Sequence, residues 1–124
     1  MVFLFLSSTN SLQYHPDNTG TDFTVELPHV VHGQYECALS EIFYDNFQDD
    51  LYVYSDICEQ NVVHNDYKPI LRIVTQPGEV QSLYFMPVSR DTVQRIRIYL
   101  RDKDFKTPQV SLNTVRCTLV LRAI

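Results

Sequence analysis

The chain has 124 residues, of which 20% are charged, and it carries a formal net charge of −5. This length fits one domain with its own hydrophobic core, so we expect a single domain over residues 1–124. No apolar run reaches the ~20 residues of a membrane-spanning helix. The apolar residues 1–6 have no basic region before them and no small-residue cleavage site after them, which argues against a signal peptide.

Apolar and polar residues alternate with a period of two along most of the chain, and no segment shows the 3.6-residue period of an amphipathic helix. The pattern predicts eight or nine strands, with turn signals every ~8–12 residues. The predicted strands, in chain order, are residues 2–7, 21–27, 33–46, 51–55, 58–67, 69–75, 80–85, 93–101 and 115–124. The 58–67 segment is predicted as an edge strand around Val62 and Val63, and residues 89–92 as a single helical turn.

Turn-forming residues set the predicted boundaries. Residues 8–20 are a polar loop that ends in a Pro-Asp-Asn-Thr-Gly turn. Pro28 is expected to end the second strand, because proline cannot donate a hydrogen bond to a central ladder. Pro87 is expected to end the strand at 80–85, which follows a strong turn signal at 76–79.

The long segment 33–46 is the centre of the predicted fold, and Glu41 interrupts its apolar face. It is about twice the usual strand length of roughly 5–6 residues. We expect one strand that bends at a bulge and serves both sheets of a sandwich. The alternative is two ordinary strands joined at Ser40 and Glu41. The face predicted to be buried holds Tyr35, Cys37, Leu39 and Phe43.

These elements predict an all-β fold, a two-sheet antiparallel β-sandwich arranged as a single jelly roll of about eight strands. An immunoglobulin-like sandwich is the alternative, but the chain lacks the tryptophan and the paired cysteines typical of antibody domains. The three cysteines are far apart in the sequence and are interpreted as free thiols that are buried or partly buried. They are Cys37, Cys58 and Cys117.

The strand at 93–101 has the clearest alternation, with Ile96, Ile98 and Leu100 on its apolar face. Its other face is predicted to hold Val93, Arg95, Arg97, Tyr99 and Arg101. Three arginines on one face could track phosphates, with Tyr99 stacking on a base. The acidic total charge instead favours a solvated outer face or a contact with a neighbouring copy, so nucleic acid is not an expected partner. In the last strand, the residues predicted to face inward are Val115, Cys117, Leu119 and Leu121.

Charge is divided unevenly between the two halves of the chain. Residues 1–62 contain ten acidic and no basic residues, whereas residues 63–124 contain ten basic and five acidic residues. The halves therefore carry −10 and +5, and these opposite charges can meet within one subunit or across a subunit boundary. We expect assembly contacts from an acidic loop at 45–50 and from the arginines of strand 93–101. The residues concerned are Asp45, Asp49, Asp50, Arg95, Arg97 and Arg101.

No motif indicates an enzyme or a cofactor. The sequence has no Gly-x-Ser-x-Gly elbow, no phosphate-binding glycine loop and no His-Glu-x-x-His motif. On a strand, His29 and His32 would point to opposite faces, and we interpret them as loop residues rather than metal ligands. The acidic loop lacks the ordered oxygen ligands of an EF-hand and is interpreted as a solvated loop rather than a calcium site.

Three regions of the chain resemble the minor capsid proteins of Polinton (Maverick) elements and related double-stranded DNA viruses. The stretches that carry the resemblance are FLFLSS at 3–8, FTVELP at 23–28, GQYECALSEI at 33–42, LYVYSDI at 51–57, LRIV at 71–74 and LVLR at 119–122, and the first two are linked by Tyr14, Pro16, Asn18 and Thr19. Members of this family carry a sizeable insertion between the third and fourth strands, where this chain has only residues 45–50. The resemblance therefore carries over no vertex decoration or receptor contact made by that insertion.

The resemblance implies a single jelly roll that forms the penton at the fivefold vertices of an icosahedral shell. It implies a homo-oligomer, with a pentamer favoured over a trimer, a major capsid protein as neighbour, and a place in a virion assembled in the host cell. The alternative function is a virion attachment or spike module that recognises a receptor or glycan. An exposed aromatic cluster near Tyr52, Tyr54 and Tyr84 would favour that alternative.

Overall fold

The computed structural model describes residues 1–109 and 114–124. All helices and strands assigned in these two ranges are β-strands, so the described chain is all-β. No helix that could span a membrane occurs in these two ranges. The strands are β1 (Val2–Ser7), β2 (Asp22–His32), β3 (Tyr35–Phe43), β4 (Leu51–Ser55), β5 (Asn61–Val63), β6 (Asp66–Lys68), β7 (Ile70–Val74), β8 (Gly78–Glu79), β9 (Met86–Pro87), β10 (Thr92–Arg101) and β11 (Arg116–Ala123).

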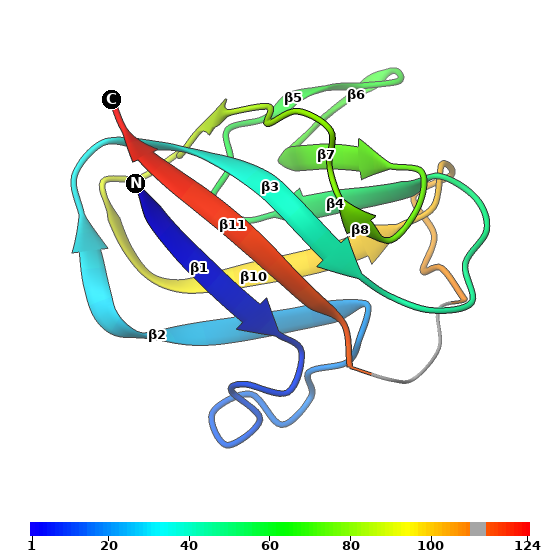
Figure 1. The fold of residues 1–124 in the computed structure, drawn as a ribbon, viewed down its shortest axis with the longest axis horizontal. Helices are drawn as coiled ribbons and strands as arrows, with labels where there is room; N and C mark the ends of the chain where they lie inside the picture. The colour runs from blue at the N-terminus through cyan, green and yellow to red at the C-terminus, as the bar shows by residue number, and fades with distance from the viewer. Residues whose placement is uncertain (110–113) are drawn as a thin grey trace.

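The strands form two antiparallel sheets that pack face to face (Figure 1). Sheet A has the order β1-β11-β3-β8, with β9 also pairing with β3, and sheet B has the order β2-β10-β4-β7. Strand β1 pairs with β11, β2 with β10, β3 with β8 and β9, and β4 with β7. The chain is thus one long hairpin wrapped over itself, with the small β5–β6 hairpin at its tip. This arrangement confirms the predicted jelly-roll sandwich.

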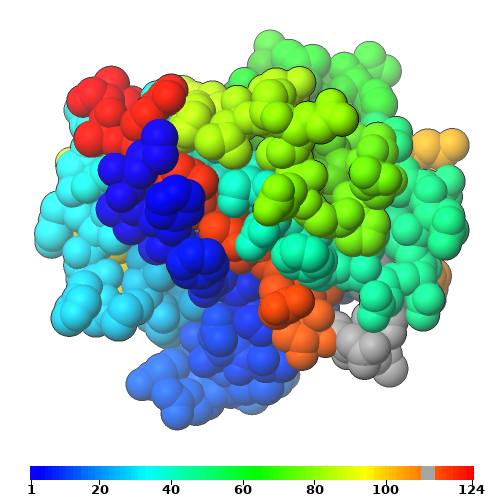
Figure 2. Space-filling view, viewed as in Figure 1, coloured from blue at the N-terminus to red at the C-terminus, as the bar shows by residue number. Residues whose placement is uncertain are grey.

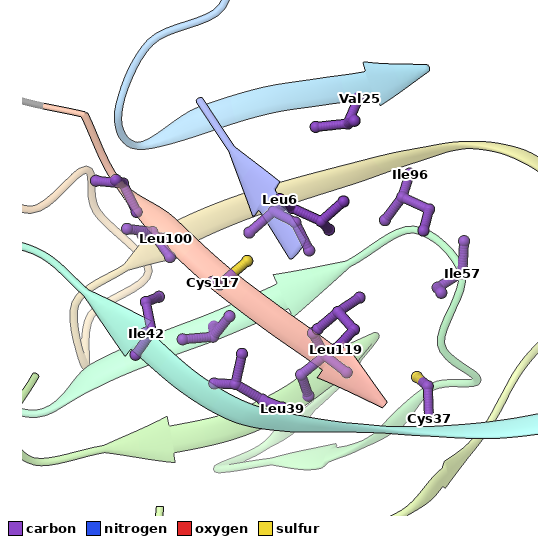
Figure 3. Close-up of a cluster of buried hydrophobic side chains, with 14 of the residues drawn as sticks. Leu6, Val25, Cys37, Leu39, Ile42, Ile57, Ile96, Leu100, Cys117 and Leu119 are labelled. Carbon is purple, nitrogen blue, oxygen red and sulfur yellow. The ribbon is translucent and has the colours of Figure 1, made fainter. Parts of the chain in front are cut away.

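A single hydrophobic core fills the space between the sheets (Figure 3). Ile96, Ile98 and Leu100 reach it from β10, and Leu119 and Leu121 from β11, as the alternation predicted. All five are at most 1% exposed. Burial of one such side chain contributes about 1.5–3 kcal/mol, so the two sheets hold together mainly through this layer.

Strand β3 contains the expected bulge, but it stays within one sheet. Leu39 pairs with Leu119 and Glu41 with the preceding Thr118, so Ser40 is an extra residue on β3. The extra residue shifts the alternation by one position, and Ile42 is fully buried whereas Phe43 is 37% exposed. The prediction that Phe43 faces the core is therefore wrong, as is the prediction that this strand serves both sheets.

A second irregularity lengthens β2 beyond its predicted end. Val93 pairs with Val31 and Arg95 with Glu26, so four residues of β2 lie opposite one residue of β10. Pro28 falls inside this irregular stretch, where no ladder hydrogen bond is required of it, and β2 continues to His32. Pro28 therefore does not end the strand.

The same irregularity corrects three side-chain assignments. Val93 is 4% exposed and belongs to the core, although strict alternation placed it with the arginines. His29 and His32 lie in β2 rather than in a loop, and both are exposed.

Residues 80–85 are not a strand, although their alternation predicted one. Only the flanking β8 and β9 pair with β3, which leaves the connection between them without a ladder partner. Residues 89–92 contain no helical turn, since β10 already begins at Thr92. The predicted edge strand at 58–67 is instead the two-stranded β5–β6 hairpin.

Candidate assembly surfaces

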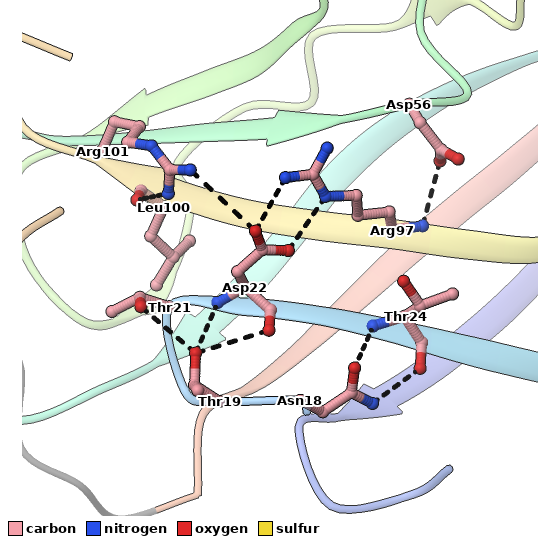
Figure 4. A network of polar contacts seen from close by, with 9 residues as sticks. All are labelled: Asn18, Thr19, Thr21, Asp22, Thr24, Asp56, Arg97, Leu100 and Arg101. Atoms are coloured by element: carbon pink, nitrogen blue, oxygen red, sulfur yellow. Dashed lines mark hydrogen bonds and ion pairs between the residues drawn. The ribbon is translucent and has the colours of Figure 1, made fainter. Parts of the chain in front are cut away.

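The three predicted arginines lie on the outer face of sheet B, where acids of β2 hold them (Figure 4). Arg97 donates two hydrogen bonds to Asp22, from Nε to Oδ1 at 2.9 Å and from Nη2 to Oδ2 at 2.7 Å. Arg101 Nη2 lies 4.0 Å from the same carboxylate. Arg95 Nε donates to Glu26 Oε1 at 3.0 Å. Each of the three arginines is therefore paired with an acid of the same subunit, and two of them share Asp22.

The polar loop 8–20 is tied to the free edge of β2. The Asn18 amide brackets Thr24, because its Nδ2 donates to the Thr24 carbonyl at 2.9 Å and its Oδ1 accepts from the Thr24 N–H at 3.0 Å (Figure 4). Ser11 Oγ accepts from the Glu26 N–H at 2.9 Å. These side chains occupy backbone groups that a further strand would need in order to pair with β2.

The jelly-roll topology explains the uneven division of charge along the chain. In each sheet, strands from residues 1–62 alternate with strands from residues 63–124, so acidic and basic halves become neighbours. The arginine ion pairs of the described residues each join an acid of the first half to an arginine of the second. These pairs are Asp56–Arg90, Glu26–Arg95, Asp22–Arg97, Asp22–Arg101 and Glu36–Arg122. The opposite charges therefore meet within one subunit, one of the two possibilities that the sequence left open.

The Asp22–Arg97 pair is expected to contribute modestly to stability. The hydrogen bond with Asp22 is the main cause that raises the pKa of Arg97. The two side chains are 38% and 43% exposed, so water screens the interaction. Asp22→Asn is therefore expected to lower the free energy of unfolding by about 0.5–1 kcal/mol. Urea denaturation of Asp22→Asn, Arg97→Gln and the double variant measures the coupling free energy between the two side chains. Asp17→Asn, at an exposed position, is the control. Losses of stability that simply add in the double variant would contradict a coupled pair.

Glu26 makes stability dependent on pH in the acidic range. Its carboxylate contacts His15 Nε2 at 2.8 Å as well as Arg95, and the hydrogen bond with His15 is the largest cause that lowers the pKa of Glu26 below 4.5. A carboxyl with a depressed folded-state pKa stabilises the fold above its unfolded pKa, and this contribution is lost as pH falls through the folded pKa. Glu26→Gln should therefore melt lower than wild type at neutral pH. In melting curves recorded across pH, the difference in Tm between wild type and Glu26→Gln should close below about pH 4.5. A difference that does not change with pH would contradict this role of Glu26.

The acidic loop 45–50 ends close to the last arginine of β10, because Arg101 pairs with Tyr52, two residues after Asp50. It connects β3 of sheet A to β4 of sheet B at one end of the sandwich (Figure 1). Asp49 and Asp50 are exposed, and no ion pair of the described residues joins either of them to an arginine of β10. The two predicted sets of assembly contacts thus come near each other at Arg101, and their role between subunits stays a prediction.

The aromatic residues of sheet B are largely buried on its outer face. Tyr52, Tyr54 and Tyr99 are 5%, 1% and 9% exposed and form a second cluster with the β5–β6 hairpin. Tyr54 and Tyr99 stack at 5.1 Å, Phe105 packs edge-on against both, and burial raises the pKa of Tyr54 to about 12. Tyr84 is exposed and lines a groove of about 340 Å³ together with Tyr52, so the receptor-binding alternative stays a prediction, although Tyr54 is buried. Tyr99 is likewise unavailable for stacking on a base.

Three of the four sheet edges carry features that block pairing with another chain. The β2 edge is occupied by the loop 8–20 and contains Pro28. At the β7 edge, Arg72 donates to the Ser82 carbonyl and lies over the Tyr84 ring at 4.0 Å. The β8–β9 edge consists of two two-residue pieces, one of which includes Pro87. Charges, prolines and short edge strands are the usual protections against unwanted strand pairing.

Strand β1 is protected only at its end, where Asn10 Oδ1 accepts from the Ser7 N–H at 2.8 Å. It is a continuous strand of six residues, VFLFLS, without charge, proline or glycine, and it pairs on one side only, with β11. Phe3 and Phe5 project outward from sheet A, are 54% and 74% exposed, and stack at 6.5 Å. Figure 2 shows the β1 side chains standing above β11 on this face. Beside Phe5, a groove of about 260 Å³ is lined by Phe43 and Arg116.

Sequence reasoning identified β1 as a strand but did not identify it as a candidate contact. The available signal was the absence of any charged residue before Asp17. That signal became informative only when the topology placed the strand at an open edge.

No group of three or more histidine, cysteine, aspartate or glutamate side chains that could hold a metal ion occurs in residues 1–109 and 114–124. Comparison with protein-family models and with curated proteins found no match to the chain.

Proposed function

We propose that this chain is a viral or virus-derived structural protein, a minor capsid protein of the penton type, that assembles with copies of itself into a symmetric ring. A pentamer is the favoured ring and a trimer the alternative. The ring would sit at a capsid vertex, next to the major capsid protein, in a virion assembled in the host cell. The protein would act by assembly rather than by catalysis.

One observation carries this proposal: a jelly roll with three blocked sheet edges leaves one apolar edge, β1, open. Exposed hydrophobic edges pair with other chains unless they are protected, so an unprotected edge indicates a contact in the assembled state. The resemblance of six stretches to minor capsid proteins supports the same function. We commit to a second copy of this chain as the occupant, because the arginines of β10 are already paired with acids of β2 on the other sheet, whereas the β1 edge presents the exposed Phe3 and Phe5.

A closed ring requires a heterologous contact, in which β1 of one copy meets a different surface of the next. Specific interfaces bury about 1,200–2,000 Å² in total, more than one strand edge supplies. The neighbour must therefore also cover the projecting Phe3 and Phe5.

Solution mass, measured over a range of protein concentration at low and moderate salt, tests the proposal. We expect a pentamer whose mass is nearly independent of salt, because apolar contacts are not screened. A strict monomer at high concentration would overturn the proposal. A dimer would exclude the ring but is compatible with the β1 contact. An oligomer that dissociates as the salt concentration rises would assign the contact to charged residues such as Arg95, Asp49 and Asp50 instead.

A further inference from the structure

Two of the three cysteines are in contact inside the sandwich. Cys37 lies in β3 of sheet A, and Cys58 follows β4 of sheet B, yet their Sγ atoms are 3.7 Å apart. Residues 86–88 join the two positions, because Met86 pairs with Cys37 and Val88 with Cys58. Figure 3 shows the Cys37 side chain inside the core near Ile57, the neighbour of Cys58. The contact therefore joins β3 of sheet A to the segment that follows β4.

We propose that Cys37 and Cys58 form a disulfide by exchange with a low-molecular-weight disulfide such as oxidised glutathione. One cysteine, as the thiolate, attacks a sulfur of the small disulfide, which gives a mixed disulfide and releases one small thiol. The second thiolate then attacks the protein sulfur of the mixed disulfide, which forms the Cys37–Cys58 bond and releases the second small thiol. The two protein thiols lose two electrons, which the small disulfide gains, and their two protons end on the released thiols.

The surroundings of the pair set its reactivity. Cys37 is fully buried and Cys58 is 3% exposed, so Cys58 is the more accessible site for the first exchange. The hydrogen bond with Cys37 is the largest cause that raises the pKa of the Cys58 thiol, followed by burial. Because the thiolate is the attacking species, exchange in the folded protein should be slow at neutral pH and faster at alkaline pH.

Cys117 provides an internal comparison within the same core. It is 2% exposed, and burial raises the pKa of its thiol to about 12. The described residues place no second sulfur within bonding distance of it. The proposed bond is thus specific for one pair among three buried cysteines, and it should be open in a reducing compartment and closed in an oxidising one.

The test uses the folded 124-residue chain incubated with oxidised glutathione at neutral and alkaline pH, and a second sample refolded in a glutathione redox buffer. Free thiols, counted after alkylation and denaturation, should fall from three to one, and the intact mass should drop by two hydrogen atoms. A peptide map should join the Cys37 and Cys58 peptides. The bond closes the loop between Cys37 and Cys58, which should raise Tm by roughly 10 °C, and reduction should reverse this rise.

Alanine variants of the three cysteines separate the outcomes. Cys117→Ala should form the bond, whereas Cys37→Ala and Cys58→Ala should keep two free thiols or hold a stable mixed disulfide with glutathione. Melting curves under reducing conditions establish that each variant is folded. Three free thiols in the refolded wild type, a bond that includes Cys117, or a mixed disulfide on Cys58 that persists in the wild type would each overturn the proposal.

Discussion

Placing a lysine on the open edge, as Phe5→Lys or as Phe3→Lys with Phe5→Lys, is expected to convert the assembled protein to monomers. Both side chains are more than half exposed in the single subunit, so their replacement removes little from the core. In the assembly they would be covered, and an unpaired charge buried at a contact is strongly unfavourable. Loss of a central aromatic contact typically weakens association by about 2 kcal/mol or more, roughly thirty-fold in Kd.

Sedimentation or single-particle mass measurement shows the shift, and melting curves show whether the subunit remains folded. Tyr14→Lys is the matched control, because Tyr14 is also an exposed aromatic residue, 65% exposed, but lies in the loop 8–20. It should leave the assembly intact. An oligomer that survives the double substitution, and that Arg97→Gln dissolves instead, would assign assembly to the outer face of sheet B.

The strands were predictable because one face of each is buried against the opposite sheet. Ile96, Ile98 and Leu100 alternate with arginines and a tyrosine, and this local pattern alone identifies the core face of β10. The jelly-roll order followed from the number and spacing of such strands. The charge asymmetry was also visible, but only the nested pairing of the two halves shows where the charges meet.

The errors arose where the structure depends on a partner strand. An extra residue such as Ser40 is invisible in the sequence of one strand, because a bulge is defined by the register with its neighbour. Residues 80–85 alternate like a strand, but only the flanking strands β8 and β9 pair with β3. The burial of Tyr54 and Tyr99 depends on the β5–β6 hairpin and on Phe105, which are distant in sequence.

The candidate contact was missed for the same physical reason. Alternation within residues 2–7 indicates a strand but does not say whether both of its edges are paired. The answer depends on where the other strands fall in the sheet, and in this fold β11 alone lies beside β1. The cysteine contact is similar, since Cys37 and Cys58 meet only because β9 runs between the two positions.

The adjacent residues Ile42 and Phe43 give a sharp test of the β3 bulge, because strict alternation and the bulged register assign the core position to different residues. In the bulged register Ile42 is fully buried and Phe43 is 37% exposed. Ile42→Ala is therefore expected to lower the free energy of unfolding by about 3–4 kcal/mol, through lost burial and a residual cavity. For a domain of this size, that loss corresponds to a fall in Tm of roughly 10–20 °C.

Phe43→Ala should cost less than about 1 kcal/mol, because the ring already lies partly in water over the outer face of sheet A, next to Arg116. Both substitutions belong in the Phe5→Lys background, so that dissociation of an oligomer does not contribute to the measured stability. Chemical denaturation of the two variants then compares neighbouring positions in one monomer. A larger loss of stability from Phe43→Ala than from Ile42→Ala would mean that β3 alternates without a break and that Ser40 is not an extra residue. Phe43 would then face the core, and Ile42 would lie on the outer face of sheet A.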